Sequence, residues 1–132
     1  METFIEDFER KYGDQHPIFY KGSYAQALKE AKKDLRFLLV YLHSDLHQDT
    51  DTFCQSVLTH KEVITYINRN NLVFWACSVN MSEGYRVSQA MRENTYPFLA
   101  LVVLKNSHMT IVKKFEGQMS VERFLRQVCK GL

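Results

Sequence analysis

Three cysteines are the residues of this sequence best suited to chemistry, and their spacing decides which chemistry is open to them. Cys54, Cys77 and Cys129 lie far apart, and none belongs to a Cys-x-x-Cys pair. That pair is the usual signature of a zinc ribbon or a dithiol redox site, so neither is predicted. Cys54 invites a redox-sensing or peroxidatic interpretation, but it stands between Phe53 and Val57, and we interpret it as a small buried hydrophobic residue.

A short polar segment is the second candidate, because histidine and aspartate alternate along it. Every second residue from 43 to 51 is one of the two: His43, Asp45, His47, Asp49 and Asp51. Imidazole and carboxylate groups do bind metals, but this spacing fits neither a helical HxxxH zinc pair nor a calcium loop with its glycine. We interpret the segment as a solvated loop with two helix-capping aspartates, and we expect no metal and no cofactor. Its carboxylates would also oppose a thiolate at Cys54.

Two groups of basic residues could bind anionic ligands. The first lysine patch follows a predicted helix and its exit, and comprises Lys29, Lys32, Lys33 and Arg36. The second lysine patch lies on a predicted hairpin, and comprises Lys105, Lys113 and Lys114. Such patches attract carboxylates and anionic lipid headgroups, although a run of charge is more often a solvated face. Lysines on an edge strand also prevent edge-to-edge aggregation.

Length and composition indicate one domain that spans residues 1–132. The chain is 45% hydrophobic and 24% charged, and a chain of this size can bury a core without metal or disulfide support. Its net charge of +2 is evenly mixed, which gives no reason to expect nucleic-acid binding. No apolar run approaches the roughly 18 residues of a membrane span, and no secretory signal is seen. Together with the unpaired cysteines, this predicts a cytoplasmic protein.

Hydrophobic periodicity predicts alternating helices and strands. Strand patterns cover residues 16–20, 36–43, 72–79, 98–104 and 109–115. Helical patterns cover residues 3–12, 23–35, 50–58 and 84–93, a segment between Thr59 and Asn70, and a last segment after Ser120. The expected caps are Thr3, Ser23 with Gln26, Thr59 with Glu62, and Ser120, while Asn94 closes a helix. In the second helix the expected buried stripe is Tyr24, Ala27, Leu28, Ala31 and Leu35.

This order of elements predicts an α/β fold of the thioredoxin-like plan with an extra N-terminal helix. A mostly parallel sheet should carry helices on both faces, and the closing hairpin should add antiparallel strands, so the sheet is mixed. The plan places a cis-proline before the first hairpin strand, where Pro97 follows Tyr96. Redox enzymes of this plan hold their cysteines after the strand equivalent to residues 37–42, where a helix N-terminus lowers the thiol pKa. The sequence has no thiol there.

Several long segments are similar to one protein family. They are residues 16–28 (HPIFYKGSYAQAL), 36–43 (RFLLVYLH), 51–54 (DTFC), 73–78 (VFWACS) and 83–100 (EGYRVSQAMRENTYPFLA). Over essentially the whole chain, these segments resemble the UAS domain of the UBX protein family, in the ETEA-type branch of the Fas-associated factors. The resemblance implies a thioredoxin-like domain without the redox dithiol. It also implies a non-enzymatic module that binds long-chain unsaturated fatty acids and self-associates on binding.

The same resemblance implies partners that bind other parts of full-length members. A ubiquitin-binding domain with a membrane-inserted hairpin precedes the UAS domain, and a C-terminal UBX domain recruits the valosin-containing AAA ATPase. The expected partners are therefore ubiquitinated clients and that ATPase, and the expected places are the cytosolic face of the endoplasmic reticulum and lipid droplets. Two other hypotheses remain open: a thiol redox or peroxidase-like enzyme, and a protein-interaction spacer with no lipid ligand.

Overall fold

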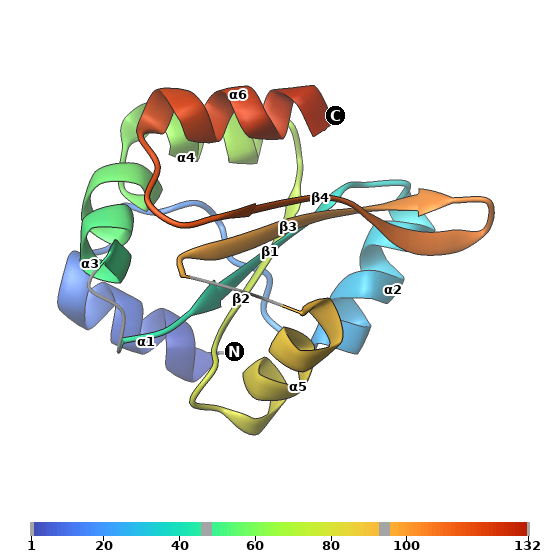
Figure 1. The fold of residues 1–132 in the computed structure, drawn as a ribbon, viewed down its shortest axis with the longest axis horizontal. Helices are drawn as coiled ribbons and strands as arrows, with labels where there is room; N and C mark the ends of the chain where they lie inside the picture. The colour runs from blue at the N-terminus through green and yellow to red at the C-terminus, as the bar shows by residue number, and fades with distance from the viewer. Residues whose placement is uncertain (1, 46–48, 93–95, 132) are drawn as a thin grey trace.

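The structure, a computed structural model, describes residues 2–45, 49–92 and 96–131. Its helices are α1 (Glu2–Tyr12), α2 (Tyr24–Asp34), α3 (Asp49–Phe53), α4 (Lys61–Arg69), α5 (Ser82–Met91) and α6 (Val121–Gly131). A π-helix, η1, covers Cys54–Leu58. The strands are β1 (Leu38–His43), β2 (Val73–Ser78), β3 (Phe98–Lys105) and β4 (His108–Glu116). Figure 1 shows helices on both sides of the sheet, which confirms the predicted layers and the extra N-terminal helix.

The four strands form one mixed sheet in the order β2-β1-β3-β4. Strands β1 and β2 are parallel, whereas β1–β3 and β3–β4 are antiparallel. The closing hairpin is therefore confirmed, but the expectation of a mostly parallel sheet is wrong. Strand β3 is buried on both faces at its first five residues because helices cover both sides. A continuous apolar pattern indicates that both faces of a strand are covered, but it does not indicate whether the strand is parallel or antiparallel to its neighbours.

The core consists of two clusters, one on each face of the sheet, and β1 contributes to both. All six residues of β1 are buried. Leu39 and Tyr41 pack into the cluster that contains side chains of α1, α4 and α6, while Val40 packs into the cluster of α2 and α5. Because successive side chains of a strand point to opposite faces, one run of apolar residues supplies both clusters.

The segment expected as an edge strand makes only a single bridge, between Phe19 and Phe74 of β2. Pro17 has no backbone N–H to donate, and the N–H of Ile18 is bound by the side chain of Asn68. The backbone groups that a ladder with β2 would need are therefore missing or already used. The prediction of a strand over residues 16–20 is wrong for this reason.

The capping box of α2 is confirmed, but its buried stripe is shorter than expected. Ser23 accepts the N–H of Gln26, and the Gln26 side chain accepts the N–H of Ser23. Ala27 and Ala31 are fully buried, whereas Leu35 is 77% exposed. Leu35 is the C-cap residue in a left-handed conformation (φ 56°), so the helical spacing ends before it and its side chain leaves the buried face.

Other helix ends differ from the predictions by one or two residues. The N-cap of α4 is His60, whose ring accepts the N–H of Glu62, so the expected Thr59 cap is wrong. Thr59 instead donates its hydroxyl to the carbonyl of Gln55. Helix α5 begins two residues earlier than predicted and ends at left-handed Arg92. The Ser120 cap of α6 is confirmed by its bond from the N–H of Arg123. The Thr3 cap is wrong, because α1 already begins at Glu2 and Thr3 lies inside the helix, and Asn94 falls outside the described residues.

The peptide bond between Tyr96 and Pro97 is cis, as predicted. It directly precedes β3, which is the central partner of both β1 and β4. None of the helices in the described ranges is both long and apolar enough to span a bilayer.

Candidate functional site

The end of β1, where redox enzymes of this plan carry their cysteines, holds a buried histidine. His43 is the last residue of β1 and is 6% exposed. Its Nε2 lies 2.8 Å from Asp45 Oδ1, and its Nδ1 lies 2.9 Å from the hydroxyl of Tyr41. A carboxylate only accepts, so Nε2 carries the proton and Nδ1 accepts the Tyr41 hydroxyl. Burial lowers the pKa of His43, although the hydrogen bond from Nε2 to Asp45 opposes this shift, and the ring is neutral.

Cys54, the first residue of η1, lies close to this histidine. Its Sγ is 3.4 Å from the Tyr41 hydroxyl and 3.9 Å from His43 Nδ1. Burial raises the pKa of the Cys54 thiol to about 12, against weaker lowering by its hydrogen bonds. Cys54 is fully buried, as predicted, but its hydrogen bonding to Tyr41 was not predicted. A thiol with this pKa contains almost no thiolate near neutral pH, so it is a poor nucleophile.

The outer part of the network ties α1 to the loop after β1 and to α3. Lys11 Nζ lies 3.1 Å from Asp51 Oδ1 and 3.9 Å from Asp45 Oδ1. The Tyr12 hydroxyl donates to the same Asp51 carboxylate. These two hydrogen bonds lower the pKa of Asp51, while burial and the Asp51 contact raise that of Tyr12. The aspartates expected in a solvated loop therefore have partners on α1.

The alternating segment forms no metal cluster in the described ranges. No group of three or more histidine, cysteine, aspartate or glutamate residues is placed to hold a metal ion there. His47 falls outside the described residues. Asp49 and Asp51 lie in the first turn of α3, where negative charge is favourable at a helix N-terminus.

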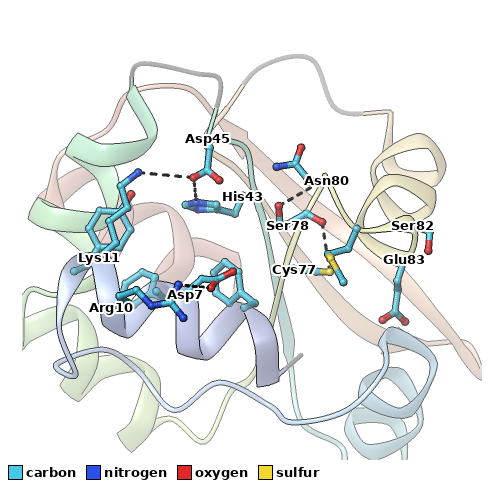
Figure 2. Close-up of a pocket in the computed structure, with 14 residues that line it drawn as sticks. Asp7, Arg10, Lys11, His43, Asp45, Cys77, Ser78, Asn80, Ser82 and Glu83 are labelled. Atoms are coloured by element: carbon cyan, nitrogen blue, oxygen red, sulfur yellow. Dashed lines mark hydrogen bonds and ion pairs between the residues drawn. The ribbon is translucent and has the colours of Figure 1, made fainter.

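A pocket of about 710 Å³ opens beside this network, between α1, the carboxyl ends of β1 and β2, and the start of α5. We call it the α1–α5 pocket. Phe4 and Phe8 of α1 and Cys77 of β2 line its apolar part. Figure 2 shows Lys11 and Arg10 on one side of the pocket, and Ser82 and Glu83 on the other. Ligands of open α/β sheets bind outside the carboxyl ends of parallel strands, and this pocket lies at such an edge.

The start of α5 is held unusually close to the end of β2. A Cβ built on Gly84 would lie 2.1 Å from the carbonyl oxygen of Ser78, so only glycine allows this approach. Glu83 accepts the N–H of Tyr24, the first residue of α2, at 2.8 Å. Gly84 and Glu83 therefore fix the wall of the pocket formed by α5. Sequence reasoning placed Gly84 at a helix start without recognising this role.

The first lysine patch is only partly as predicted. Lys29, Lys32 and Lys33 are exposed on α2 at positions i, i+3 and i+4, which share one helix face. None of the three forms an ion pair with the described residues. Arg36 differs, because it pairs with Glu30 at 3.6 Å and donates Nε to a backbone carbonyl at 2.8 Å. Arg36 is therefore occupied, and the available cations are the three lysines.

The second lysine patch does not form one surface. Lys113 pairs with Leu101, and Lys114 pairs with Ala100 in the ladder with β3. Neighbouring residues of a strand point to opposite faces, so the two lysines cannot act together. Lys114 donates to the carbonyl of Met91 at the end of α5, and Lys105 lies at the far end of the hairpin. The alternation of side chains along the predicted strand was a signal that could have separated Lys113 from Lys114.

Comparison with solved structures confirms the fold. A thioredoxin from Thermus thermophilus superposes with a TM-score of 0.74 at 25% identity, over 89% of this chain and 91% of that chain. A putative disulphide-isomerase from Bacteroides thetaiotaomicron superposes with a TM-score of 0.71 at 22% identity, over 89% and 93%. The fold is therefore thioredoxin-like, as predicted from the order of elements.

Comparison of sequences shows the family. The family model described as Fas-associated factor 1 matches residues 4–130. FAS-associated factor 2 of Homo sapiens is 56% identical over 126 residues, which cover 96% of this chain and 28% of that protein. Plant UBX domain-containing protein 10 of Arabidopsis thaliana is 32% identical over 126 residues, which cover 92% and 26%. The chain thus spans under a third of these relatives, and it belongs to the Fas-associated factor family, as a thioredoxin-like UAS domain.

Proposed function

We propose that this domain is a non-catalytic binding module of an adaptor protein, which binds long-chain unsaturated fatty acids and self-associates on binding. The non-catalytic part is supported by the network at the end of β1. A neutral His43 lies at the end of β1, where redox enzymes of this plan carry their cysteines, and the nearby Cys54 is buried with a pKa of about 12. The family membership supports an adaptor, because the Fas-associated factor match covers residues 4–130.

The observation that carries the fatty-acid proposal is the exposed lysine triplet of α2. Lys29, Lys32 and Lys33 are free to bind a carboxylate, and the 77% exposed Leu35 lies one residue beyond the helix. An exposed ion pair contributes at most about 1 kcal/mol, so the lysines orient the ligand. Burial of the acyl chain, at roughly 25 cal/mol per Å², supplies most of the affinity.

This division of roles gives a physical reason for self-association. A chain that lies on the surface of α2 keeps one side in water, and a second copy of the domain can cover that side. Apolar area is then buried between two protein surfaces, which adds to the hydrophobic free energy. A cis double bond bends the chain, so saturated and unsaturated acids differ in how they fit the shared surface.

The test reverses the charge of the triplet, with the variant Lys29→Glu, Lys32→Glu, Lys33→Glu. Light scattering is measured with oleate and with stearate, below the concentration at which micelles form. We expect the native domain to form oligomers with oleate, and the variant to stay monomeric while its thermal midpoint changes little.

A matched control reverses three exposed cations of α4 and α6, with the variant Lys61→Glu, Arg69→Glu, Lys130→Glu. It has the same net charge as the triplet variant, and it should oligomerise like the native domain. Oligomers in the triplet variant would remove these lysines from the proposal, and equal loss in both variants would show a net-charge effect. No response of the native domain to any fatty acid would favour an interaction spacer.

In the intact protein, the proposed partners bind outside this domain. Ubiquitinated clients and the valosin-containing AAA ATPase are proposed to bind other segments, at the cytosolic face of the endoplasmic reticulum and of lipid droplets. The isolated domain should therefore not retain the purified ATPase in a binding assay. Retention by the domain alone would contradict this assignment of roles.

A further inference from the structure

Met81, on the rim of the α1–α5 pocket, departs from the usual chemistry of a helix start. It is the N-cap residue of α5, it makes no side-chain hydrogen bond to the first turn, and it is 49% exposed. Ser, Thr, Asp or Asn at this position stabilises a protein by about 1 kcal/mol, because the side-chain oxygen accepts an N–H of the first turn. Residues that contradict local preference concentrate at functional sites. Met81 therefore places an exposed apolar side chain at this rim, in a position where a polar residue would stabilise the helix.

The opposite wall, formed by α1, contributes two aromatic side chains beside its charged ones. Phe4 and Phe8 lie one turn apart on α1, with ring centroids 6.0 Å apart, and both line the pocket. Methionine is flexible and polarisable, so with two aromatic rings it makes an adaptable site for an apolar group. Asn80 and Ser82 stand on the α5 side of the pocket (Figure 2). Amide and hydroxyl groups suit a ligand with hydrogen-bonding groups of its own, as a peptide backbone has.

The charges of the pocket disfavour an anionic ligand. Three carboxylates and two cations line it: Asp7, Asp45, Glu83, Arg10 and Lys11. Both cations are already paired, Arg10 with Asp7 at 3.0 Å and Lys11 with the carboxylates of the network. A fatty-acid headgroup would find no free cation here. A basic group would meet a net negative charge of one carboxylate, with Asp7 paired to Arg10, Asp45 paired to Lys11, and Glu83 bound by the N–H of Tyr24.

We propose that the α1–α5 pocket binds an apolar side chain of an extended peptide from a partner protein, next to a basic residue of that peptide. The apolar side chain packs between Phe4, Phe8 and Met81, and the basic residue lies near the carboxylates of Asp7 and Glu83. This site is separate from the lysine triplet. The pocket meets α2 at its first residue, through Glu83 and Tyr24, whereas the lysines lie from the middle of that helix to its last turn.

Fluorescence anisotropy with labelled nonapeptides tests the proposal. The probe has a central Lys-Phe-Lys in a Gly/Ser sequence, and two matched peptides carry Glu-Phe-Glu or Lys-Ala-Lys instead. We expect saturable binding of the first peptide, and at least tenfold weaker binding of the other two. Equal binding of all three peptides, or no binding of the first up to 1 mM, would overturn the proposal.

Two variants locate the binding at this pocket. Met81→Ser supplies the missing cap, so it should raise the thermal midpoint. It also removes the apolar side chain, so it should weaken the binding of the Lys-Phe-Lys peptide at least threefold. Tyr85→Ser removes another exposed apolar side chain of α5, 57% exposed and outside the pocket, and it should leave the affinity unchanged. Unchanged affinity in Met81→Ser would refute the site.

Oleate separates this proposal from the fatty-acid proposal. It should leave the bound peptide in place in the Lys29→Glu, Lys32→Glu, Lys33→Glu variant. Displacement of the peptide from that variant would mean that an acyl chain competes for the pocket, which would overturn the separation of the peptide site from the fatty-acid site. Loss of the peptide site alone would leave oligomer formation through the lysine triplet unaffected.

Discussion

Removing the hydroxyl of Tyr41 tests whether the network at the end of β1 stabilises the fold. Tyr41 is fully buried, and its hydroxyl lies 2.9 Å from His43 Nδ1 and 3.4 Å from Cys54 Sγ. In the described part of the chain, every buried side-chain nitrogen and oxygen has a hydrogen-bond partner. The variant Tyr41→Phe would remove the hydroxyl donor of His43 Nδ1 and leave only the weakly donating thiol of Cys54, 3.9 Å away.

The size of the effect follows from these contacts. Loss of the hydroxyl leaves the buried Nδ1 acceptor of His43 without its strong donor, which costs about 1–3 kcal/mol. The greater hydrophobicity of phenylalanine offsets part of the upper end of this range, so we expect a loss of about 2 kcal/mol. For a domain of this size that corresponds to a fall in the thermal midpoint of roughly 8 °C.

Urea unfolding, followed by the fluorescence of Trp75, measures the change. With a slope of about 2 kcal/mol per molar urea, the midpoint should fall by about 1 M while the slope stays the same. Tyr85→Phe is the matched control, since that side chain is 57% exposed, and its midpoint should not move. If the free energy of unfolding of Tyr41→Phe lies within about 0.5 kcal/mol of that of the native domain, the network does not stabilise the fold as described.

Three further predictions follow from single contacts. Because burial lowers the pKa of His43, the unfolded chain binds a proton more readily, and the urea midpoint should fall as the pH drops below about 6.5; a flat profile from pH 7.5 to 5.5 would contradict this. Gly84→Ala places a Cβ against Ser78, and thermal melts should show a loss of about 1–3 kcal/mol. Ser23→Ala breaks the capping box with Gln26, and amide exchange in α2 should show about 1 kcal/mol less protection; unchanged exchange would mean that the cap is redundant.

Much of the fold could be predicted because its signals are local. The apolar run of residues 36–43 indicated a strand buried on both faces, and β1 is one. Ser23 and Gln26 formed a recognisable cap, and Pro97 occupies the cis position expected of the fold. Leu35 shows where a local pattern fails. Its spacing continues the helical stripe, but the helix ends at Asp34 and Leu35 is itself the left-handed C-cap.

The candidate site could not be predicted, because its parts converge only after folding. His43 and Cys54 were each considered from the sequence, yet nothing local shows that η1 packs beneath β1 and brings them within 3.9 Å. The pocket combines Phe8 of α1 with Met81, the N-cap residue of α5, and the two are more than seventy residues apart in the chain. A methionine before a helix start does not indicate a binding site in the sequence, because the facing residues of α1 are known only from the structure.

Thiol labelling of the folded domain tests the central claim that this thioredoxin-like domain has no reactive centre at the end of β1. Iodoacetamide is added at pH 8 with and without denaturing urea, and peptide mapping reads the modification of each cysteine. The pKa of about 12 predicts that Cys54 stays unmodified in the folded domain, while exposed Cys129 reacts readily. Rapid modification of Cys54 without urea, at a rate equal to that of Cys129, would contradict the account.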